Sequence, residues 1–298
     1  MPNSASQKYI LVVDDDPTMQ LILQGMIEKA GFKPVIAENG EKAIQFIEVG
    51  GANIAVVLLD RHLPDMDGLE VVKKIHAIDG CADTQIIMQS GSKEPKDIRE
   101  AIESGVFYYL TKPFKIEALQ NALNFAIGNQ ELRSVLQDRL SRGYAPVNLL
   151  RSSSFEFSKM EDARKMTILL ASFFPEPFAV FSGISALLSN AVQHGSCGLG
   201  FDGKTALLNA PDYKEAFSKL EEANADKSIE VQFIQKDGRF SIRVTDQGKG
   251  FDWKSWSAFE EARDDMCHGY GVLKALRCFD EVKYNTAGNQ VMASIYQK

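Results

Sequence analysis

The stretch VVLLDRHLPDMDG, from Val56 to Gly68, decides the fold of the first part of this chain. Its first four residues are branched and apolar, and they lead directly into a carboxylate, Asp60. A short apolar run bounded by turn residues is typical of a buried strand in a parallel sheet. The stretch therefore predicts a central strand with an acidic side chain at its carboxyl end.

Apolar runs and amphipathic segments alternate on both sides of this strand through the first 125 residues. This alternation is the pattern of parallel strands joined by crossover helices. The DDDP stretch at residues 14–17 predicts a helix capped by an aspartate, with Pro17 in its first turn. We expect a doubly wound, five-stranded parallel α/β domain over residues 1–125, with strands at Tyr9–Val13, Pro34–Ala37, Ile54–Leu59, Gln85–Gln89 and Phe107–Leu110.

A helical apolar stripe continues past the end of this domain. It consists of Ile116, Leu119, Leu123, Ile127, Leu132, Leu136 and Leu140. The stripe can serve as the seam of a homodimer or pack on either domain. The stretches SRGYAP and RSSS then interrupt the pattern and predict a hinge. Residues 126–154 are therefore expected to form a helical linker and hinge.

Residues 155–298 show a different pattern and predict a second domain. The segment FEF predicts a short strand, and helices are expected at about Met160–Phe174 and Pro177–His194. Residues 198–227 are polar, with a short helix expected near residues 213–223. Alternating apolar residues around the Asp237-Gly238 dipeptide predict a hairpin, and a second strand pair is expected around Gly288.

Composition excludes several classes of protein. The chain has 298 residues, 45% of them hydrophobic, and a formal net charge of -7, which is ordinary for two globular domains. Neither a signal peptide nor a run of about 20 apolar residues is present, so we expect a cytoplasmic protein without a membrane partner. No basic DNA-binding element is found, so no nucleic-acid partner is expected. The scattered Cys81, Cys197, Cys267 and Cys278 predict free thiols.

Polar side chains follow four of the predicted parallel strands. Asp14, Asp15 and Asp16 follow the first, Asp60 the third, Ser90 the fourth and Lys112 the fifth. The carboxyl ends of parallel strands meet at one edge of a sheet, where ligands gather. Clustered carboxylates favour a hard cation such as Mg²⁺. A carboxylate beside Mg²⁺ and an ammonium is suited to accept a phosphoryl group, so Asp60 is the predicted nucleophile.

The segments ILVVDDD, LLDRHLPDMDG, QSG and YLTKPF resemble, in order and spacing, the response-regulator receiver family of two-component signalling. The resemblance implies a flavodoxin-like fold and a phosphorelay in which a histidine kinase or phosphotransfer protein phosphorylates Asp60. It implies that Asp15, Asp60 and the backbone carbonyl of His62 ligate Mg²⁺, with Asp14 acting through water. It also implies that Ser90 and Lys112 contact the phosphoryl group and that Tyr109 turns inward as Ser90 moves.

Three segments of the second domain carry a further set of candidate residues: LLSNAVQHG, VTDQGKGFD and HGYGVLKAL. A Gly-x-Gly sequence that enters a helix offers backbone N–H groups and the positive end of the helix dipole to a polyphosphate. An aspartate at a strand end can accept a hydrogen bond from an adenine amino group. Asn190 offers an uncharged oxygen to a metal that phosphate has already neutralised.

In this order the segments resemble the N, G1 and G2 boxes of the GHKL ATPases, which include gyrase B and histidine kinases. The resemblance is greatest to the anti-sigma-factor serine kinases and covers about residues 155–298. It implies an α/β two-layer sandwich of the Bergerat type that binds ATP, with a lid at residues 252–268. The implied contacts are Asn190 to Mg²⁺, Asp246 to adenine, Gly248 and Gly250 in the base loop, and Gly269 and Gly271 at the phosphates.

One position departs from the serine kinase pattern. The glutamate expected four residues before Asn190 is replaced by Ala186. A methyl group cannot accept a proton, and losing a general base typically costs about 10²- to 10⁴-fold in rate. His194 can assist as a base, cap the end of its helix or form a wall of the nucleotide pocket. We expect a response regulator whose output domain binds a partner, an anti-sigma antagonist or sigma factor, with weak or absent kinase activity; the alternative is an active serine/threonine kinase that phosphorylates an anti-sigma antagonist.

Overall fold

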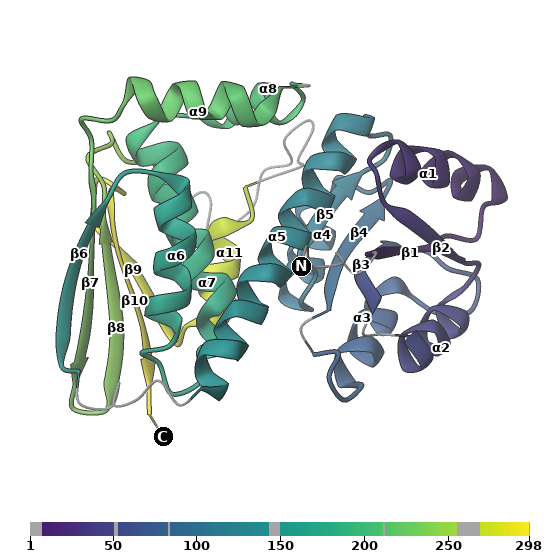
Figure 1. The fold of residues 1–298 in the computed structure, drawn as a ribbon, viewed down its shortest axis with the longest axis horizontal. Coiled ribbons are helices and arrows are strands. Elements are labelled where there is room, and N and C mark those ends of the chain that lie inside the picture. The colour runs from purple at the N-terminus through teal and green to yellow at the C-terminus, as the bar shows by residue number, and fades with distance from the viewer. Residues whose placement is uncertain are drawn as a thin grey trace, which may run out of the picture. The chain divides into compact units, whose positions relative to one another are not determined.

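The computed structural model describes residues 8–50, 53–82, 84–142, 150–210, 212–254 and 269–297 (Figure 1). These residues form two compact units, one up to Gln130 and the other from Glu131 onward. The long helix α5, Ile116–Ser141, contributes residues to both units. Among the described residues, no helix has the length and apolarity that crossing a membrane requires.

The first unit is a parallel sheet with the strand order β2-β1-β3-β4-β5. Its strands are β1 Tyr9–Val13, β2 Lys33–Ala37, β3 Ile54–Asp60, β4 Gln85–Ser90 and β5 Tyr108–Thr111. Its helices are α1 Pro17–Lys29, α2 Gly40–Gly50, α3 Gly68–Ala77, α4 Pro95–Glu103 and the first part of α5. The predicted doubly wound fold is confirmed, and no strand end differs from its predicted position by more than one residue.

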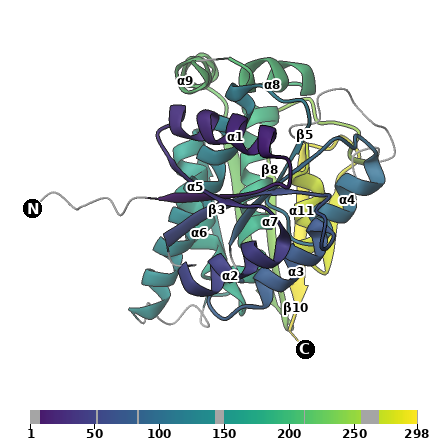
Figure 2. The ribbon, with the colours of Figure 1, turned by 90° about the vertical axis from the view of Figure 1, so that its right-hand side faces the viewer.

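Both faces of this sheet are covered. Helix α1 lies on the opposite side of the sheet from α2 and α3 in both ribbon views (Figures 1 and 2). All seven residues of β3 are buried, which explains its nearly unbroken apolar sequence. Helix α1 begins as predicted, because the Asp16 carboxylate accepts the Thr18 N–H at 2.8 Å and Pro17 occupies the first turn.

The apolar stripe of α5 packs within its own chain. Leu119, Leu123 and Ile127 are buried in the core of the first unit. Leu136 is fully buried in the core of the second unit, where Leu132 and Leu140 pack against the same core. These contacts use the positions that a dimer seam would require, and the homodimer stays a prediction.

The second unit is an antiparallel sheet with the order β6-β7-β8-β10-β9, and helices α6, α7 and α11 lie on one of its faces (Figure 1). The strands are β6 Ser152–Phe157, β7 Ile229–Lys236, β8 Arg239–Thr245, β9 Glu281–Tyr284 and β10 Gln290–Tyr296. The helices are α6 Met160–Ala171, α7 Pro177–Asn190, the π-helix η3 Ala191–Ser196, α8 Phe201–Leu208, α9 Tyr213–Ala223 and α11 Gly271–Cys278.

Most of the expected elements of the second unit are present. The hairpin turns at Asp237 and Gly238, whose φ angles of 50° and 73° are both positive, as a tight turn of this kind requires. Three details differ from the prediction. Helix α6 ends at Ala171, three residues before the predicted end. The helix that begins at Pro177 changes to a π-helix after Asn190, and α8 forms where a polar segment was expected. Cys81, Cys197 and Cys278 are free thiols as predicted, and Cys267 lies outside the described residues.

The two neighbouring apolar residues Val135 and Leu136 allow a matched test of how α5 packs. Leu136 is fully buried, whereas Val135 is 53% exposed. Truncating Leu136 to alanine is expected to destabilise the second unit by about 2–5 kcal/mol, because a cavity remains in its core. Val135→Ala is expected to change stability by less than about 0.5 kcal/mol. Chemical denaturation of the full chain measures both, and equal effects would contradict the packing described.

Candidate functional site

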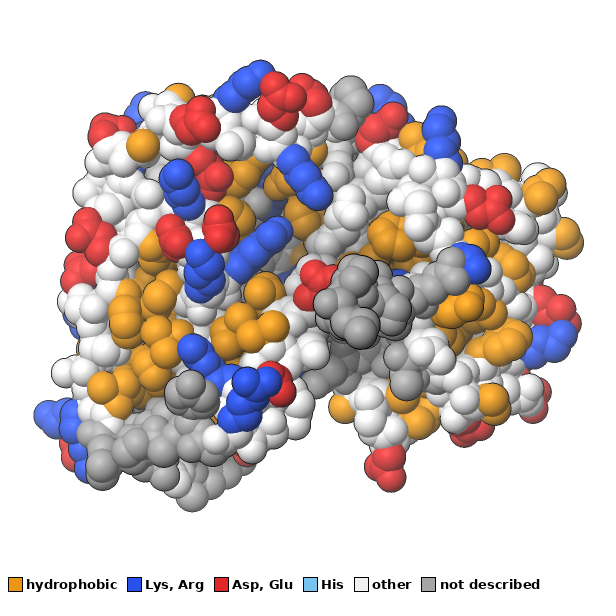
Figure 3. Space-filling view, viewed as in Figure 1, with side chains coloured by type: hydrophobic (Ala, Val, Ile, Leu, Met, Phe, Trp, Pro, Cys, Tyr) orange, Lys and Arg blue, Asp and Glu red, His pale blue; other side chains and the backbone are white. Residues whose placement is uncertain are grey.

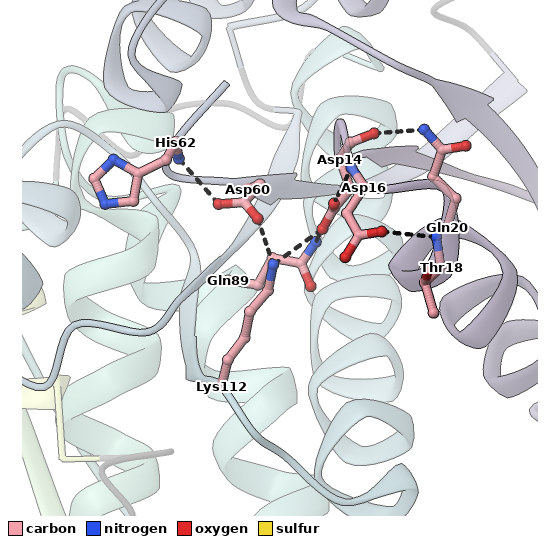
Figure 4. A network of polar contacts seen from close by, with 8 residues as sticks. All are labelled: Asp14, Asp16, Thr18, Gln20, Asp60, His62, Gln89 and Lys112. Atoms are coloured by element: carbon pink, nitrogen blue, oxygen red, sulfur yellow. Dashed lines mark hydrogen bonds and ion pairs between the residues drawn. The ribbon is translucent and has the colours of Figure 1, made fainter. Parts of the chain in front are cut away.

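The carboxyl ends of the parallel strands bring three of the predicted residues into direct contact (Figure 4). The Lys112 ammonium donates to Asp14 Oδ2 at 3.0 Å and also to Asp60 Oδ2. The other Asp60 oxygen, Oδ1, accepts the backbone N–H of His62 at 2.9 Å. The His62 ring points away from the carboxylates and is exposed. Lysine and carboxylates from strands far apart in the sequence thus form one polar cluster.

Burial and charge act in opposite directions on this cluster. Asp14 is only 1% exposed. Burial raises the pKa of Asp14 above its ordinary value, although the hydrogen bonds from Lys112 and the Asp16 backbone lower it in part. Burial also lowers the pKa of Lys112, but its hydrogen bonds to Asp60 and Asp14 outweigh this and raise that pKa. The lysine therefore stays charged at neutral pH.

Ser90 and Tyr109 lie on β4 and β5, which are paired strands of the same sheet. Ser90 is buried, and its Oγ accepts the Ser92 N–H at 3.1 Å. The Tyr109 hydroxyl donates to the Ser92 carbonyl at 3.1 Å. Burial raises the pKa of Tyr109, and a hydrogen bond with Ser90 lowers it in part. Tyr109 is 1% exposed, so its ring lies inward in this structure.

The donor set suits a divalent cation. Asp14 and Asp60 place two carboxylates beside the single ammonium of Lys112, which leaves an excess of negative charge. Asp15 is exposed, and hard oxygen ligands are those that Mg²⁺ prefers. Across the described parts of the chain, no three or more His, Cys, Asp and Glu side chains are grouped to hold a metal. The predicted direct ligands include two carboxylates and a carbonyl, and they stay a prediction.

Sequence reasoning missed two glutamines at this site. Gln89 Nε2 donates to Asp14 Oδ2 at 2.9 Å, and Gln20 Nε2 donates to the Asp14 carbonyl at 2.6 Å. Gln89 is fully buried, and its Oε1 has no hydrogen-bond partner within the described residues. The available signal was a polar residue inside an apolar strand, directly before Ser90.

Comparison with known proteins agrees with this geometry. The model of the response regulator receiver domain matches residues 10–124. The chain is 31% identical over 123 residues to the chemotaxis protein CheY1 of Helicobacter pylori, an alignment that covers 41% of this chain and 98% of that protein. It is 32% identical over 120 residues to a CheY homolog of Campylobacter jejuni, covering 40% and 92%.

The chain belongs to the response regulator receiver domain family. One similar solved structure is the receiver domain of the sensor histidine kinase PA1611 from Pseudomonas aeruginosa PAO1, which has a magnesium ion in its active site cleft. That domain is 28% identical to this chain with a TM-score of 0.39, and the match covers 41% of this chain and 98% of that one. The receiver family indicates a two-component response regulator that is phosphorylated on an aspartate. The family match ends at residue 124, before the second unit begins.

Beyond the receiver, the structure brings Asn190 and Gly271 together. A Cβ added at Gly271 would lie 2.6 Å from the Asn190 side-chain nitrogen, so the start of α11 approaches the end of α7 as closely as glycine allows. Asn190 is followed directly by the π-helix η3. Isolated π-helical turns are frequent at functional sites. Gly269, with a φ of 102°, shapes the approach to α11.

Asp246 packs against the same η3 segment. A Cβ added at Gly195 would lie 2.4 Å from Asp246 Cγ, and the Gly248 N–H donates to Asp246 Oδ1 at 2.8 Å. Burial raises the pKa of Asp246, while the Gly248 hydrogen bond lowers it in part. Gly250 instead allows a close approach to the Ala287 backbone, because a Cβ at Gly250 would lie 1.8 Å from the Ala287 carbonyl oxygen. Of the predicted lid, residues 255–268 lie outside the described residues.

His194 does not have the properties of a general base. Its Nδ1 donates to the Leu199 carbonyl, and burial together with the nearby Lys204 lowers its pKa to about 4. A buried imidazole this weakly basic stays neutral and has little affinity for a proton at neutral pH. The structure therefore speaks against the general-base alternative for this residue.

Two glycines allow a direct test of the contact between η3 and Asp246. Gly195→Ala is expected to destabilise the second unit by about 1–3 kcal/mol, because the new methyl group must displace the half-buried Asp246 side chain. Gly203→Ala, at an exposed position of helix α8, meets only Leu199 at 3.5 Å and is expected to stabilise the protein by roughly 0.5–1 kcal/mol. Urea denaturation distinguishes these signs, and a neutral effect at position 195 would contradict the contact.

Proposed function

We propose that this protein is a response regulator that carries phosphate on Asp60 and controls an ATP-binding, partner-binding output unit. The observation that carries the receiver part of the proposal is the Lys112 ammonium shared by Asp14 and Asp60. This arrangement leaves a carboxylate at the carboxyl edge of the sheet with a cation already beside it. The phosphoryl donor is a histidine kinase or phosphotransfer protein, the partners with which receiver domains interact.

The transfer step needs an oxygen nucleophile and a way to neutralise charge. An Asp60 oxygen attacks the phosphorus of a donor phosphohistidine, the new O–P bond forms, and the N–P bond breaks with its electron pair returning to the imidazole. Asp15, Asp60 and the His62 carbonyl would hold Mg²⁺, which supplies charge neutralisation to the transferring oxygens. Lys112 leaves Asp60 for a phosphoryl oxygen while its bond to Asp14 holds the ammonium in place.

Phosphorylation would also change the groups beside Asp60. The Ser90 hydroxyl donates to a phosphoryl oxygen, which requires Ser90 and the neighbouring Ser92 backbone to rearrange. Tyr109 donates to the Ser92 carbonyl, so the ring responds to the same movement. Helix α5 begins at Ile116, shortly after Lys112 and the cis peptide bond to Pro113. These contacts offer a physical route from the phosphorylated carboxylate to α5.

Helix α5 in turn contacts α7 of the output unit. Arg133 donates to the Phe178 carbonyl at 3.4 Å, and its guanidinium lies over the Phe178 and Phe181 rings at 5.4 and 5.2 Å from their centroids. Arg133 is 8% exposed, so moving it would disturb well-packed neighbours. Since α7 ends at Asn190, a shift of α5 can alter the proposed nucleotide site.

The output unit is proposed to have the Bergerat fold of GHKL ATPases and to bind ATP with Mg²⁺. The close approach of Gly271 to Asn190 supports this, because it brings an amide oxygen that could bind a metal next to the start of α11, where the first N–H groups have no partner within the helix. Asp246 Oδ1 accepts the Gly248 N–H, which leaves Oδ2 for an adenine amino group. Because Ala186 supplies no base, the proposed output is regulated binding of an anti-sigma antagonist or sigma factor, with phosphate transfer weak or absent.

Phosphorylation of Asp60 can be tested by mass. Incubation with a small-molecule phosphodonor and Mg²⁺ is expected to add about 80 daltons to the intact chain. Asp60→Ala should abolish this addition, whereas the exposed Asp79→Ala should leave it unchanged. Intact-protein mass spectrometry gives the result directly. Equal labelling of the Asp60→Ala variant would refute Asp60 as the phosphate carrier.

Nucleotide binding is tested by calorimetry on the full chain. ATP with Mg²⁺ is expected to bind, and Asn190→Ala or Asp246→Ala is expected to weaken binding by about 10-fold or more, since each removes a polar contact. The exposed Asp202→Ala is the control. Beryllofluoride should change the ATP affinity of the wild type and not that of Asp60→Ala. Transfer of labelled phosphate from ATP to a serine of an anti-sigma antagonist would instead establish the kinase alternative.

A further inference from the structure

Two glycines define how α7 and α11 pack against each other. A Cβ added at Gly183 would lie 2.7 Å from Cys278 Cβ, and one added at Gly271 would lie 2.6 Å from the Asn190 amide nitrogen. Residue 183 of α7 thus lies beside residue 278, near the end of α11, and residue 190, at the end of α7, lies beside residue 271 at the start of α11. The helices are antiparallel, and each pair of contacts is separated by two helical turns.

The residues halfway between these contacts face each other across the interface. On α7 they are Ala186 and Leu187, and on α11 they are Lys274 and Ala275. Leu187 is 2% exposed and Ala275 is fully buried, whereas Ala186 and Lys274 are both half-buried. Successive residues of an α-helix are rotated by 100° about its axis. In this antiparallel pair, positions 186 and 274 therefore lie on one side of the interface, and positions 187 and 275 lie on the other. Lys274 thus flanks the position where a serine kinase would carry its glutamate.

An ammonium beside position 186, in place of a carboxylate at that position, changes what the site can do. A general base must lie within hydrogen-bond reach of the attacking hydroxyl, and that hydroxyl must approach the terminal phosphate. An ammonium beside the same position donates hydrogen bonds and accepts none. It therefore cannot deprotonate a hydroxyl in its charged form, but it is well suited to bind a phosphate oxygen.

Lys274 interacts with the charges of two other basic side chains, of which Arg277 lies toward the Gly183 end of the interface, away from Asn190. Burial lowers the pKa of Lys274 to about 8, an effect opposed by Cys278 and increased by Lys204 and Arg277. Lys204 also lowers the pKa of His194. Lys204 is therefore near both residues, although it belongs to α8. An anion bound near Lys274 and Lys204 would interact favourably with both ammonium groups.

We propose that Lys274 binds the terminal phosphate of ATP from the space beside Ala186, so that the site retains the triphosphate and does not activate a hydroxyl. This inference rests on the proposed ATP-binding function of the second unit. It adds a residue that the N, G1 and G2 box pattern does not assign. It also explains why a methyl group stands at position 186, because a carboxylate there would pair with Lys274 and occupy the phosphate site.

The test compares ATP with ADP, which lacks the terminal phosphate. Lys274→Met in the full chain, titrated with Mg²⁺ present, is expected to bind ATP about 10- to 100-fold more weakly and ADP within about 3-fold of the wild type. Arg277→Met removes the same charge from an exposed position of the same helix and should change neither affinity. A purely structural role for Lys274 would weaken both nucleotides equally and would overturn the proposal.

A second variant tests the pairing of positions 186 and 274. Ala186→Glu is expected to weaken ATP binding by a similar factor, because the new carboxylate neutralises Lys274. Lys274→Met added to Ala186→Glu should then cost little more, since the same ammonium is removed twice. Additive losses would show that the two positions do not interact and would contradict the inference.

Outcomes for the inference and for the proposed function can be separated. If the wild type binds ATP and Lys274→Met binds both nucleotides as the wild type does, the inference fails and the ATP-binding function stands. If the wild type binds no ATP, both fail. Lys274→Arg keeps the charge and should retain the preference for ATP over ADP. This variant gives a second result should the methionine variant not fold. Loss of the preference in a folded Lys274→Arg protein would contradict phosphate binding at this position.

Discussion

The Lys112 ammonium between the Asp14 and Asp60 carboxylates is the interaction on which the receiver site depends. Asp14 is almost completely buried, and an uncompensated buried carboxylate costs several kcal/mol. Lys112, Gln89 and the Asp16 backbone N–H together provide that compensation. Lys112 and Gln89 are distant from Asp14 in the sequence, so they reach it only when the strands are paired in the observed order. The polar cluster therefore depends on the topology of the sheet and in turn favours it.

The receiver could be predicted closely because its signals are local. Each strand is an apolar run, and Asp60 and Lys112 occur where those runs end, so strand spacing is enough to bring them to one edge. Gln89 could not be assigned a role, because a polar side chain within a strand has no pattern that names its partner. That partner, Asp14, lies 75 positions earlier and is reached only through the parallel pairing of β1, β3 and β4.

The second unit could be predicted less closely, because several of its features depend on glycines or on contacts between distant residues and leave no local pattern in the sequence. Helix α8 was missed because three glycines, Gly198, Gly200 and Gly203, lie in or near it and lower helix propensity. The π-helix η3 has no periodic signature either; it occurs where Gly195 must accommodate the Asp246 side chain. The motifs identified candidate residues, but the relation between Ala186 and Lys274 follows only from the antiparallel packing of α7 and α11.

The two sites present opposite electrostatic problems, and helix α5 is the element that contributes to both units. At the receiver site carboxylates exceed cations, so a divalent metal and then a phosphoryl group change the balance of charge around Lys112. In the second unit Lys204 interacts with both Lys274 and His194, so an anion bound beside Lys274, as proposed, would be favoured. Arg133 couples α5 to α7 through a buried guanidinium that contacts two aromatic rings. Because such a group is costly to leave without its neighbours, α5 and α7 are expected to move together. The proposed regulation would therefore require only that phosphorylation favour one position of α5 over another.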